Sequence, residues 1–183
     1  VNSSTICSGQ QTATLIASGA NTYSWIPGNN LSSTTGTLVT GTPTISQNYT
    51  VVGTDINGCY SSTITAITVN SLPFITTNTA SICAGQQTAT LTANGANTYT
   101  WSPGTGLSAT TGTAVTGTPS TTQTYTLSGT DANGCIGNTT TTITVNTLPT
   151  ITVNNASICI GQQTATLTAN GADTYTWNPT SDL

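Results

Sequence analysis

Residues 83–101, CAGQQTATLTANGANTYTW, decide the fold of this chain because they contain two alternating segments and the turn that joins them. Apolar side chains take every second position in residues 88–93, and the alternation returns at Tyr99 and Trp101. A period of two indicates β-strands with one buried and one solvated face. Residues 94–97, NGAN, indicate a turn, since Gly and Asn tolerate positive φ. We therefore expect two strands joined by a turn, with the tryptophan facing the core of a sandwich.

The stretch occurs three times at a fixed spacing. Residues 7–25 read CSGQQTATLIASGANTYSW and residues 159–177 read CIGQQTATLTANGADTYTW, so successive copies lie 76 residues apart. A fixed period without insertions indicates one structural unit copied in tandem. We expect repeat 1 at residues 1–71, cropped at its N-terminal side, and repeat 2 at residues 72–147. Repeat 3, at residues 148–183, is partial and is expected to hold the first strands only.

Repeat 2 shows the strand pattern of one complete unit. Asn133-Gly134, placed before the last alternating segment, is a strong hairpin signal. About seven short strands with regularly spaced turns predict an all-β, antiparallel Greek-key sandwich. The predicted strands, besides one short edge piece, are residues 74–79, 87–93, 98–102, 113–117, 123–131 and 139–146.

Aromatic residues and leucines at the inward positions of these strands are expected to form the core of each unit. The tryptophans could in principle stack on sugars, but their alternation with polar neighbours favours a core position against a disulfide. The predicted core residues are Trp25, Trp101, Trp177, Tyr49, Tyr125, Leu15, Leu91 and Leu167.

The composition excludes several functional classes. The chain has no Lys, Arg or His and only four acidic residues, which gives a net charge of −4. Without cations it has no electrostatic basis for binding nucleic acid or an anionic membrane surface. No segment is long enough for a membrane-spanning helix, so we expect no membrane insertion. About a quarter of the residues are Thr, a β-branched residue that favours sheet over helix.

The same composition argues against an enzyme. General acid–base catalysis needs paired titratable groups, and a nucleophile needs a neighbouring base. The four aspartates are far apart in the sequence and no phosphate-binding or dinucleotide-binding glycine motif occurs. We therefore expect no catalytic residue and no cofactor.

The five cysteines follow the repeat. Cys7 and Cys59 are separated by 52 residues, as are Cys83 and Cys135. We expect one disulfide inside each unit, Cys7–Cys59 and Cys83–Cys135, each worth roughly 4 kcal/mol by chain entropy. Cys159 would then have its partner outside the chain. A metal site would need clustered Cys or His, which the sequence lacks, and disulfides indicate an extracellular, oxidising location.

Short connectors join the units. Leu72-Pro73 and Leu148-Pro149 stand between the last strand of one repeat and the first strand of the next. Proline fixes its own φ and keeps the preceding residue extended, so such a joint is stiffer than a Gly/Ser linker. With the leucine buried at the joint, we expect the sandwiches to form an extended rod.

Two further patterns have a functional and a structural interpretation. Residues 55–58 and 131–134, D-x-N-G, resemble the start of a calcium loop, but each supplies one carboxylate where calcium takes several, so a hairpin turn is favoured. Outward Thr88, Thr90 and Thr92 could contact a glycan or ice. We favour a solvated strand face, because sandwich sheets twist and flat binding faces require little twist.

The motifs together resemble a known family. They read C-x-G-Q-x-x-x-x-L-x-A-x-G-A-x-x-Y-x-W-x-P at residues 83–103, T-Y-T-[VL]-x-G-T-D-x-N-G-C at residues 124–135, and T-x-T-V-N-x-L-P at residues 142–149. This pattern is similar to the PKD-like, immunoglobulin-like repeats of large secreted surface proteins of the Bacteroidetes. The resemblance implies a tandem β-sandwich stalk or adhesin region, exported by the type IX system.

From the residues and the resemblance we expect a structural segment of an extracellular bacterial surface fibre or stalk. Its partners would be neighbouring repeats or further copies of the chain. The alternative is an adhesin module that contacts glycan or ice through its outward Thr and Asn side chains.

Overall fold

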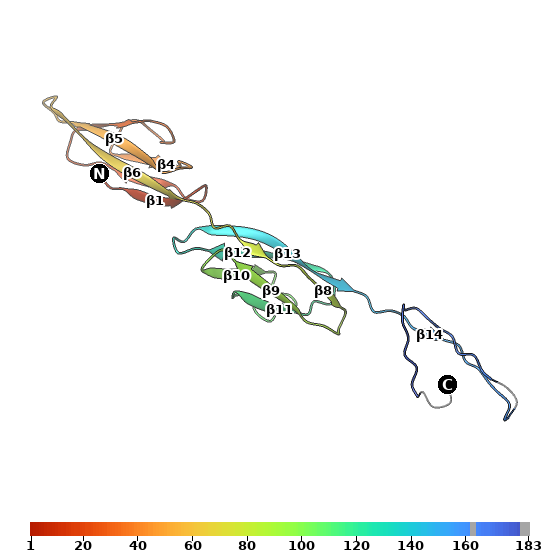
Figure 1. The fold of residues 1–183 in the computed structure, drawn as a ribbon. Helices are drawn as coiled ribbons and strands as arrows, with labels where there is room; N and C mark the ends of the chain where they lie inside the picture. Colours follow the sequence, from red (N-terminus) through yellow and green to blue (C-terminus); the bar gives the residue numbers. More distant parts are fainter. Residues whose placement is uncertain (162–163, 180–183) are drawn as a thin grey trace.

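The computed structural model describes residues 1–161 and 164–179 of the chain. Within this part the secondary structure consists of strands and turns, without a helix. Figure 1 shows repeats 1 and 2 as two sandwiches placed end to end, with the described part of repeat 3 beyond them. The predicted all-β fold is confirmed, and the sandwiches of repeats 1 and 2 follow one another as expected for an extended rod.

The strands of corresponding units match closely. Repeat 1 contains β1 (Ser4–Cys7), β2 (Ala13–Ile16), β3 (Thr22–Ile26), β4 (Leu38–Gly41), β5 (Gln47–Thr54) and β6 (Tyr60–Asn70). Repeat 2 contains β7 (Thr76–Thr77), β8 (Ala80–Cys83), β9 (Ala89–Asn94), β10 (Thr98–Ser102), β11 (Ala114–Gly117), β12 (Gln123–Thr130) and β13 (Ile136–Asn146). The described part of repeat 3 contains β14 (Thr152–Val153) and β15 (Ala169–Asn170).

Repeat 2 is an immunoglobulin-like sandwich of two sheets, with strand orders β10-β12-β13-β8 and β11-β9-β7. Of the predicted strand at residues 74–79 only β7 is formed; the chain then leaves this sheet and joins the other one as β8, which lies beyond the predicted range. There β8 runs parallel to the last strand, with Ile82 opposite Val145. The start of the unit therefore supplies an edge strand to each of the two sheets, β7 to one and β8 to the other.

Alternation places the apolar side chains between the sheets. In β9 the exposed fraction falls to 0 % at Leu91, whereas the neighbouring threonines Thr90 and Thr92 are exposed. Trp25, Trp101, Tyr49, Tyr125, Leu15 and Leu91 are all buried, as predicted. They belong to two separate hydrophobic clusters, one in repeat 1 and one in repeat 2.

The polar atoms of the buried aromatic residues are hydrogen-bonded. In repeat 2 the Trp101 indole Nε1–H donates to the Gly112 carbonyl at 3.0 Å, and the Tyr125 hydroxyl donates to the Thr105 carbonyl at 2.9 Å. Burial raises the pKa of the Tyr125 hydroxyl above its usual value, and that of Tyr49 in the same position of repeat 1. Both groups donate within the core, so the neutral form is the one the fold stabilises.

Repeat 3 has no comparable core in its described residues, which corrects two predictions. Leu167 is 41 % exposed and Trp177 is only half-buried, although both were expected in a core. The reason is that their counterparts Leu91 and Trp101 pack against β11, β12 and β13, whereas no strand follows Trp177 among the described residues.

Candidate functional site

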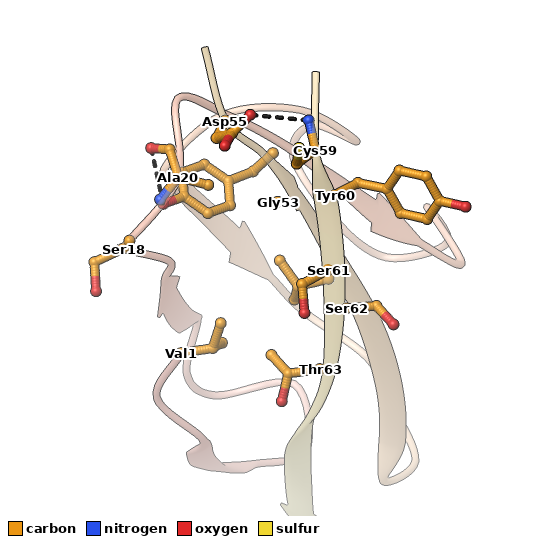
Figure 2. A pocket seen from close by; sticks show the side chains of 13 residues that line it. Val1, Ser18, Ala20, Gly53, Asp55, Cys59, Tyr60, Ser61, Ser62 and Thr63 are labelled. Carbon is orange, nitrogen blue, oxygen red and sulfur yellow. Dashed lines mark hydrogen bonds between the residues drawn. The ribbon is translucent and has the colours of Figure 1, made fainter. Parts of the chain in front are cut away.

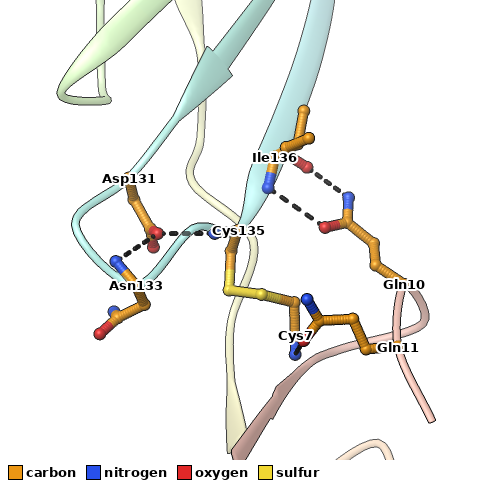
Figure 3. The surroundings of a disulfide bond; sticks show 7 residues. All are labelled: Cys7, Gln10, Gln11, Asp131, Asn133, Cys135 and Ile136. Carbon is orange, nitrogen blue, oxygen red and sulfur yellow. Dashed lines mark hydrogen bonds between the residues drawn. A yellow bond between two sulfur atoms is a disulfide. The ribbon is translucent and has the colours of Figure 1, made fainter.

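The disulfide of this chain joins two repeats. Cys7 in repeat 1 is bonded to Cys135 in repeat 2, with an S–S distance of 2.03 Å and a Cα–Cα distance of 5.4 Å (Figure 3). The two pairings predicted within repeats, Cys7–Cys59 and Cys83–Cys135, are wrong, because Cys59 and Cys83 are free thiols. Cys7 and Cys135 are nevertheless both disulfide-bonded, as predicted.

The strand register explains why the pairings within repeats cannot form. Cys7 ends β1 and lies opposite Asn70, at the far end of β6. Cys59 directly precedes Tyr60, where β6 begins. The 11 residues of β6 span roughly 35 Å, whereas disulfide-bonded cysteines keep their Cα atoms about 4–7 Å apart. Repeats 1 and 2 therefore each carry their two cysteines at opposite ends, and the observed bond joins one repeat to the next.

The disulfide is buried at the junction and lies outside both hydrophobic clusters. Cys7 is 1 % exposed and Cys135 is fully buried. Neither cysteine belongs to the clusters that contain Trp25 and Trp101. The expectation that the tryptophans pack against a disulfide is therefore wrong, and the bond instead fixes one sandwich to the next.

A glutamine from repeat 1 supports the junction. The Gln10 side-chain Nε2 donates to the Ile136 carbonyl at 2.6 Å, and the Ile136 N–H donates to Gln10 Oε1 at 3.1 Å (Figure 3). The neighbouring Gln11 Oε1 accepts the Cys7 N–H at 3.0 Å. The two glutamines therefore play separate roles, one across the junction and one within repeat 1.

An aspartate shapes the other side of the junction. Asp131 Oδ1 accepts the N–H of Asn133 at 2.8 Å and that of Cys135 at 2.9 Å (Figure 3). Gly134 completes the turn with φ of 79°, a conformation that favours glycine. The D-x-N-G motif at residues 131–134 thus forms a turn that positions Cys135. A turn is the interpretation that the sequence favoured over a calcium loop. Sequence reasoning missed that Asp131 and Gln10 serve the disulfide. The available signal was that Gln follows Cys7 and Cys83 at the same spacing, and that Asp precedes Cys59 and Cys135 at the same spacing.

Two of the free cysteines, Cys59 and Cys83, have the same local hydrogen bond as their bonded counterparts. Asp55 Oδ1 accepts the N–H of Cys59 at 2.9 Å, the arrangement found at Cys135. The Cys83 N–H donates to Gln87 Oε1 at 3.0 Å, the arrangement found at Cys7. Cys59 therefore has the local geometry of Cys135, and Cys83 that of Cys7. Cys159, expected to pair outside the chain, is a free and exposed thiol.

The connectors contribute differently from the prediction. Leu72 is 41 % exposed and Leu148 is 44 % exposed, so the leucine expected to be buried at each joint is not. In repeat 2 the buried residue is Ile75, with 6 % exposed. Pro73, half-buried, brings its carbonyl against the backbone at Gly137, so closely that a Cβ added to this glycine would collide with the carbonyl oxygen. Pro149 is exposed.

The described residues offer little other chemistry. They contain no group of three His, Cys, Asp or Glu side chains that could hold a metal ion. They also contain no helix long and apolar enough to span a membrane. The threonines of the predicted alternative glycan or ice face, Thr88, Thr90 and Thr92, are exposed in and before β9. The junction is therefore the feature in which polar side chains, a covalent bond and two repeats come together.

No protein-family model and no curated sequence matches this chain. Among solved structures, immunoglobulin domains 1–4 of Sidekick-1 align with 82 % of the chain at 18 % identity and a TM-score of 0.35. A Ca²⁺-stabilised adhesin with which an Antarctic bacterium binds ice aligns with 82 % at 20 % identity and a TM-score of 0.42. The alignments cover 51 % and 49 % of those two chains, so this chain spans about half their length.

Proposed function

We propose that this chain is a structural segment of an extracellular fibre or stalk, in which immunoglobulin-like repeats stand end to end and a disulfide locks the junction. The observation that carries the proposal is the bond between Cys7 and Cys135, which joins consecutive repeats. A disulfide inside one sandwich would stabilise that sandwich alone. A disulfide between sandwiches fixes their relative position and adds a second covalent connection between the two repeats, besides the backbone.

The disulfide changes how a pulling force is transmitted along the chain. A force that enters through the residues ahead of Cys7 passes across the S–S bond directly to Cys135, whose sequence separation from Cys7 is 128. The loop between them holds most of repeat 1 and the larger part of repeat 2. While the bond is intact the loop cannot be drawn out, even if its sandwiches unfold. Load-bearing without extension is what a stalk or fibre requires.

Composition supports the same role and a location outside the cell. Disulfides persist in oxidising compartments. The similarity of the repeat motifs to surface proteins of the Bacteroidetes supports a bacterial cell surface, with export by the type IX system. The absence of Lys, Arg and His leaves the chain without the acid–base pairs on which most catalysis depends, so we propose a non-catalytic function.

Single-molecule stretching of the 183-residue chain tests the proposal. Tethered at its two ends, the oxidised chain is expected to keep the loop from Cys7 to Cys135 closed. Reduction should add about 45 nm of contour length, from a separation of 128 residues at roughly 3.6 Å each. A variant in which Cys59, Cys83 and Cys159 are all serine is the control and should behave like the parent chain. An oxidised chain that already extends to the full length of the reduced chain would refute the proposal.

A further inference from the structure

One sheet face of repeat 1 carries apolar side chains that repeat 2 does not have. The four strands β1, β6, β5 and β3 of repeat 1 form the same sheet as β8, β13, β12 and β10 of repeat 2. On the outer face of this sheet repeat 1 has Ile26, Val52 and Ile64. The same positions of repeat 2 hold hydroxyl side chains, namely Ser102, Ser128 and Thr140. The two repeats therefore share a core but differ in this outer face.

The three apolar residues lie next to one another. Cross-strand pairing places Ile26 opposite Thr50 and Thr50 opposite Ile64, so the isoleucines flank one threonine in a row across β3, β5 and β6. Val52 lies in the next outward row of the same strands. Ile26 is 57 % exposed and Ile64 is 69 % exposed. Apolar residues scattered singly over a surface are ordinary, whereas a cluster of them indicates an interaction surface.

Neighbouring repeats leave this face uncovered. Repeat 2 has a repeat at either end (Figure 1), and its residues in the same row, Ser102, Thr126 and Thr140, are exposed. Stacking of the sandwiches end to end therefore does not bury the face. A partner that covers the isoleucines of repeat 1 must approach from the side of the rod.

The same face is hollowed beside β3. A cavity of about 460 Å³ lies there, and its lining includes Ser24, Val52 and residues 35–37. Ser24 pairs with Val52, whereas Ile26 pairs with Thr50, so the hollow lies one outward row, about 7 Å, from the isoleucines. A protruding isoleucine and a hollow thus stand side by side on one face.

A twofold axis between these two rows, perpendicular to the strands, makes the face complementary to itself. Such an axis reverses the strand direction, so each row of one copy faces the other row of its partner. Ile26 of each copy then faces Ser24 and the hollow of the other copy. Thr50 faces Val52 in the same way. The apolar row of one chain therefore meets the recessed row of the second chain.

The charges of the chain are compatible with this arrangement. The outward positions of β3, β5 and β6 carry no acidic or basic side chain. The acid of repeat 1, Asp55, lies in the turn that joins β5 to β6, where its carboxylate accepts the Cys59 N–H (Figure 2). With antiparallel strands the two Asp55 residues lie roughly 27 Å apart, well beyond the screening length of about 8 Å in physiological salt.

The size of the face suits a weak dimer. Four strands about 4.8 Å apart are roughly 19 Å wide, and the 8 residues of β5 span about 27 Å, which gives about 500 Å² per copy. Two copies would bury about 1,000 Å² in total, the lower limit for a specific interface. The hydroxyl face of repeat 2 is a poorer partner, because isoleucines would leave its hydroxyl groups without hydrogen bonds.

We propose that two chains pair side by side through the β3–β5–β6 face of repeat 1, with their strands antiparallel and Ile26 of each copy seated in the hollow beside Ser24 of the other. The inference rests on the proposed function and deepens it, since it names the surface by which one stalk segment binds another. The occupant is a second copy of repeat 1, because that surface offers the isoleucine row and the hollow at the matching spacing.

Sedimentation equilibrium of the 183-residue chain tests the proposal. Serine in place of Cys59, Cys83 and Cys159 prevents disulfide exchange between chains. We expect a dimer that forms between about 10 μM and 1 mM, as is typical of a small interface. The variant I26S/V52S/I64T should weaken it at least tenfold, and its new residues are those that repeat 2 already accepts at these positions.

Two further variants separate this contact from general stickiness. Ile56 is 86 % exposed in the turn beyond the sheet, and repeat 2 has Ala132 there, so I56A is the control and should leave the dimer unchanged. S24L adds an apolar side chain but fills the hollow, so it should weaken the dimer at least tenfold. A non-specific apolar contact would instead be strengthened by the leucine. Circular dichroism checks that each variant keeps its sheet structure.

Three outcomes would overturn lateral pairing. They are a chain that stays monomeric up to about 1 mM, an equal loss of association in I56A and the triple variant, and a stronger dimer in S24L. None of them affects the proposed function, because stretching of single chains measures a loop within one chain. Conversely, an oxidised chain that extends fully would refute the proposed function and leave the sedimentation result intact.

Discussion

The side-chain amide of Gln10 and the backbone of Ile136 exchange two hydrogen bonds across the boundary between two repeats. The pair imitates the pairing of two strands, with a side chain in place of one backbone. Next to it the Cys7–Cys135 bond holds the same two surfaces covalently. Directional hydrogen bonds beside a disulfide restrict rotation about the junction further than the connector of residues 71–75 does alone.

Replacing Cys135 with serine should loosen the junction without unfolding either sandwich, since the disulfide lies outside both cores. We expect small-angle X-ray scattering to show a broader distribution of interdomain distances and a more flexible chain. Closing a loop of 128 residues is worth about 5 kcal/mol of unfolded-state entropy, so the variant should also unfold at lower denaturant concentration. C159S is the control, and an unchanged scattering profile for C135S would contradict the prediction.

Replacing Gln10 with alanine should make the disulfide easier to reduce. The variant loses two hydrogen bonds, each worth about 1 kcal/mol at most at an exposed site, which shifts the thiol–disulfide equilibrium up to about thirtyfold. Titration against glutathione redox buffers measures that shift. Gln86, the same position in repeat 2, makes no side-chain hydrogen bond to any described residue, so Q86A should leave the titration of Cys7–Cys135 unchanged. Equal shifts in both variants would show that the bonds of Gln10 are unimportant.

The position of residues 72–77, which precede β8 in repeat 2, can be tested by substituting a matched pair of glycines. Gly19 and Gly95 have φ of 102° and 104°, so alanine at either position costs about 1–2 kcal/mol of backbone strain. Only at Gly95 would the added Cβ also collide with the Phe74 carbonyl. We therefore expect G95A to destabilise repeat 2 by a further ~1–3 kcal/mol beyond the effect of G19A on repeat 1. Chemical denaturation measures both, and equal losses would mean that residues 72–77 do not occupy this space.

The stability of both sandwiches should fall at high pH. Burial raises the pKa of Tyr49 and Tyr125 above the usual value of 10.0. Below pH 10 the folded and the unfolded chain both keep the hydroxyl protons of these tyrosines, so the free energy of unfolding does not depend on them. Above pH 10 the unfolded chain loses them first, so the free energy of unfolding should fall by up to about 1.4 kcal/mol per pH unit for each tyrosine. Denaturation between about pH 8 and pH 11.5 checks the slope, which the Y49F/Y125F variant should reduce.

Local patterns were sufficient for most strands. Period-two alternation placed the β10 strand at residues 98–102 with its observed bounds, and the Asn133-Gly134 turn before β13 was predicted from its dipeptide. The β8 strand (Ala80–Cys83) was missed, because the predicted first strand ended at residue 79 and no local pattern shows that the chain crosses to the other sheet there. The burial of Leu91 was predicted correctly, whereas that of Leu167 was not, since alternation marks an inward face but not the presence of strands to cover it.

The sequence by itself determined the repeated unit, its sheet structure and the presence of disulfide chemistry, because periodicity, turn residues and cysteine spacing are local properties. Only the tertiary structure decided which cysteines meet. Cys7 and Cys59 are closer in sequence than Cys7 and Cys135, but β1 runs parallel to β6 and so carries Cys7 to the end of the sandwich opposite Cys59. The partner of a cysteine depends on which ends of which strands share a place in space, and linear spacing contains no such information.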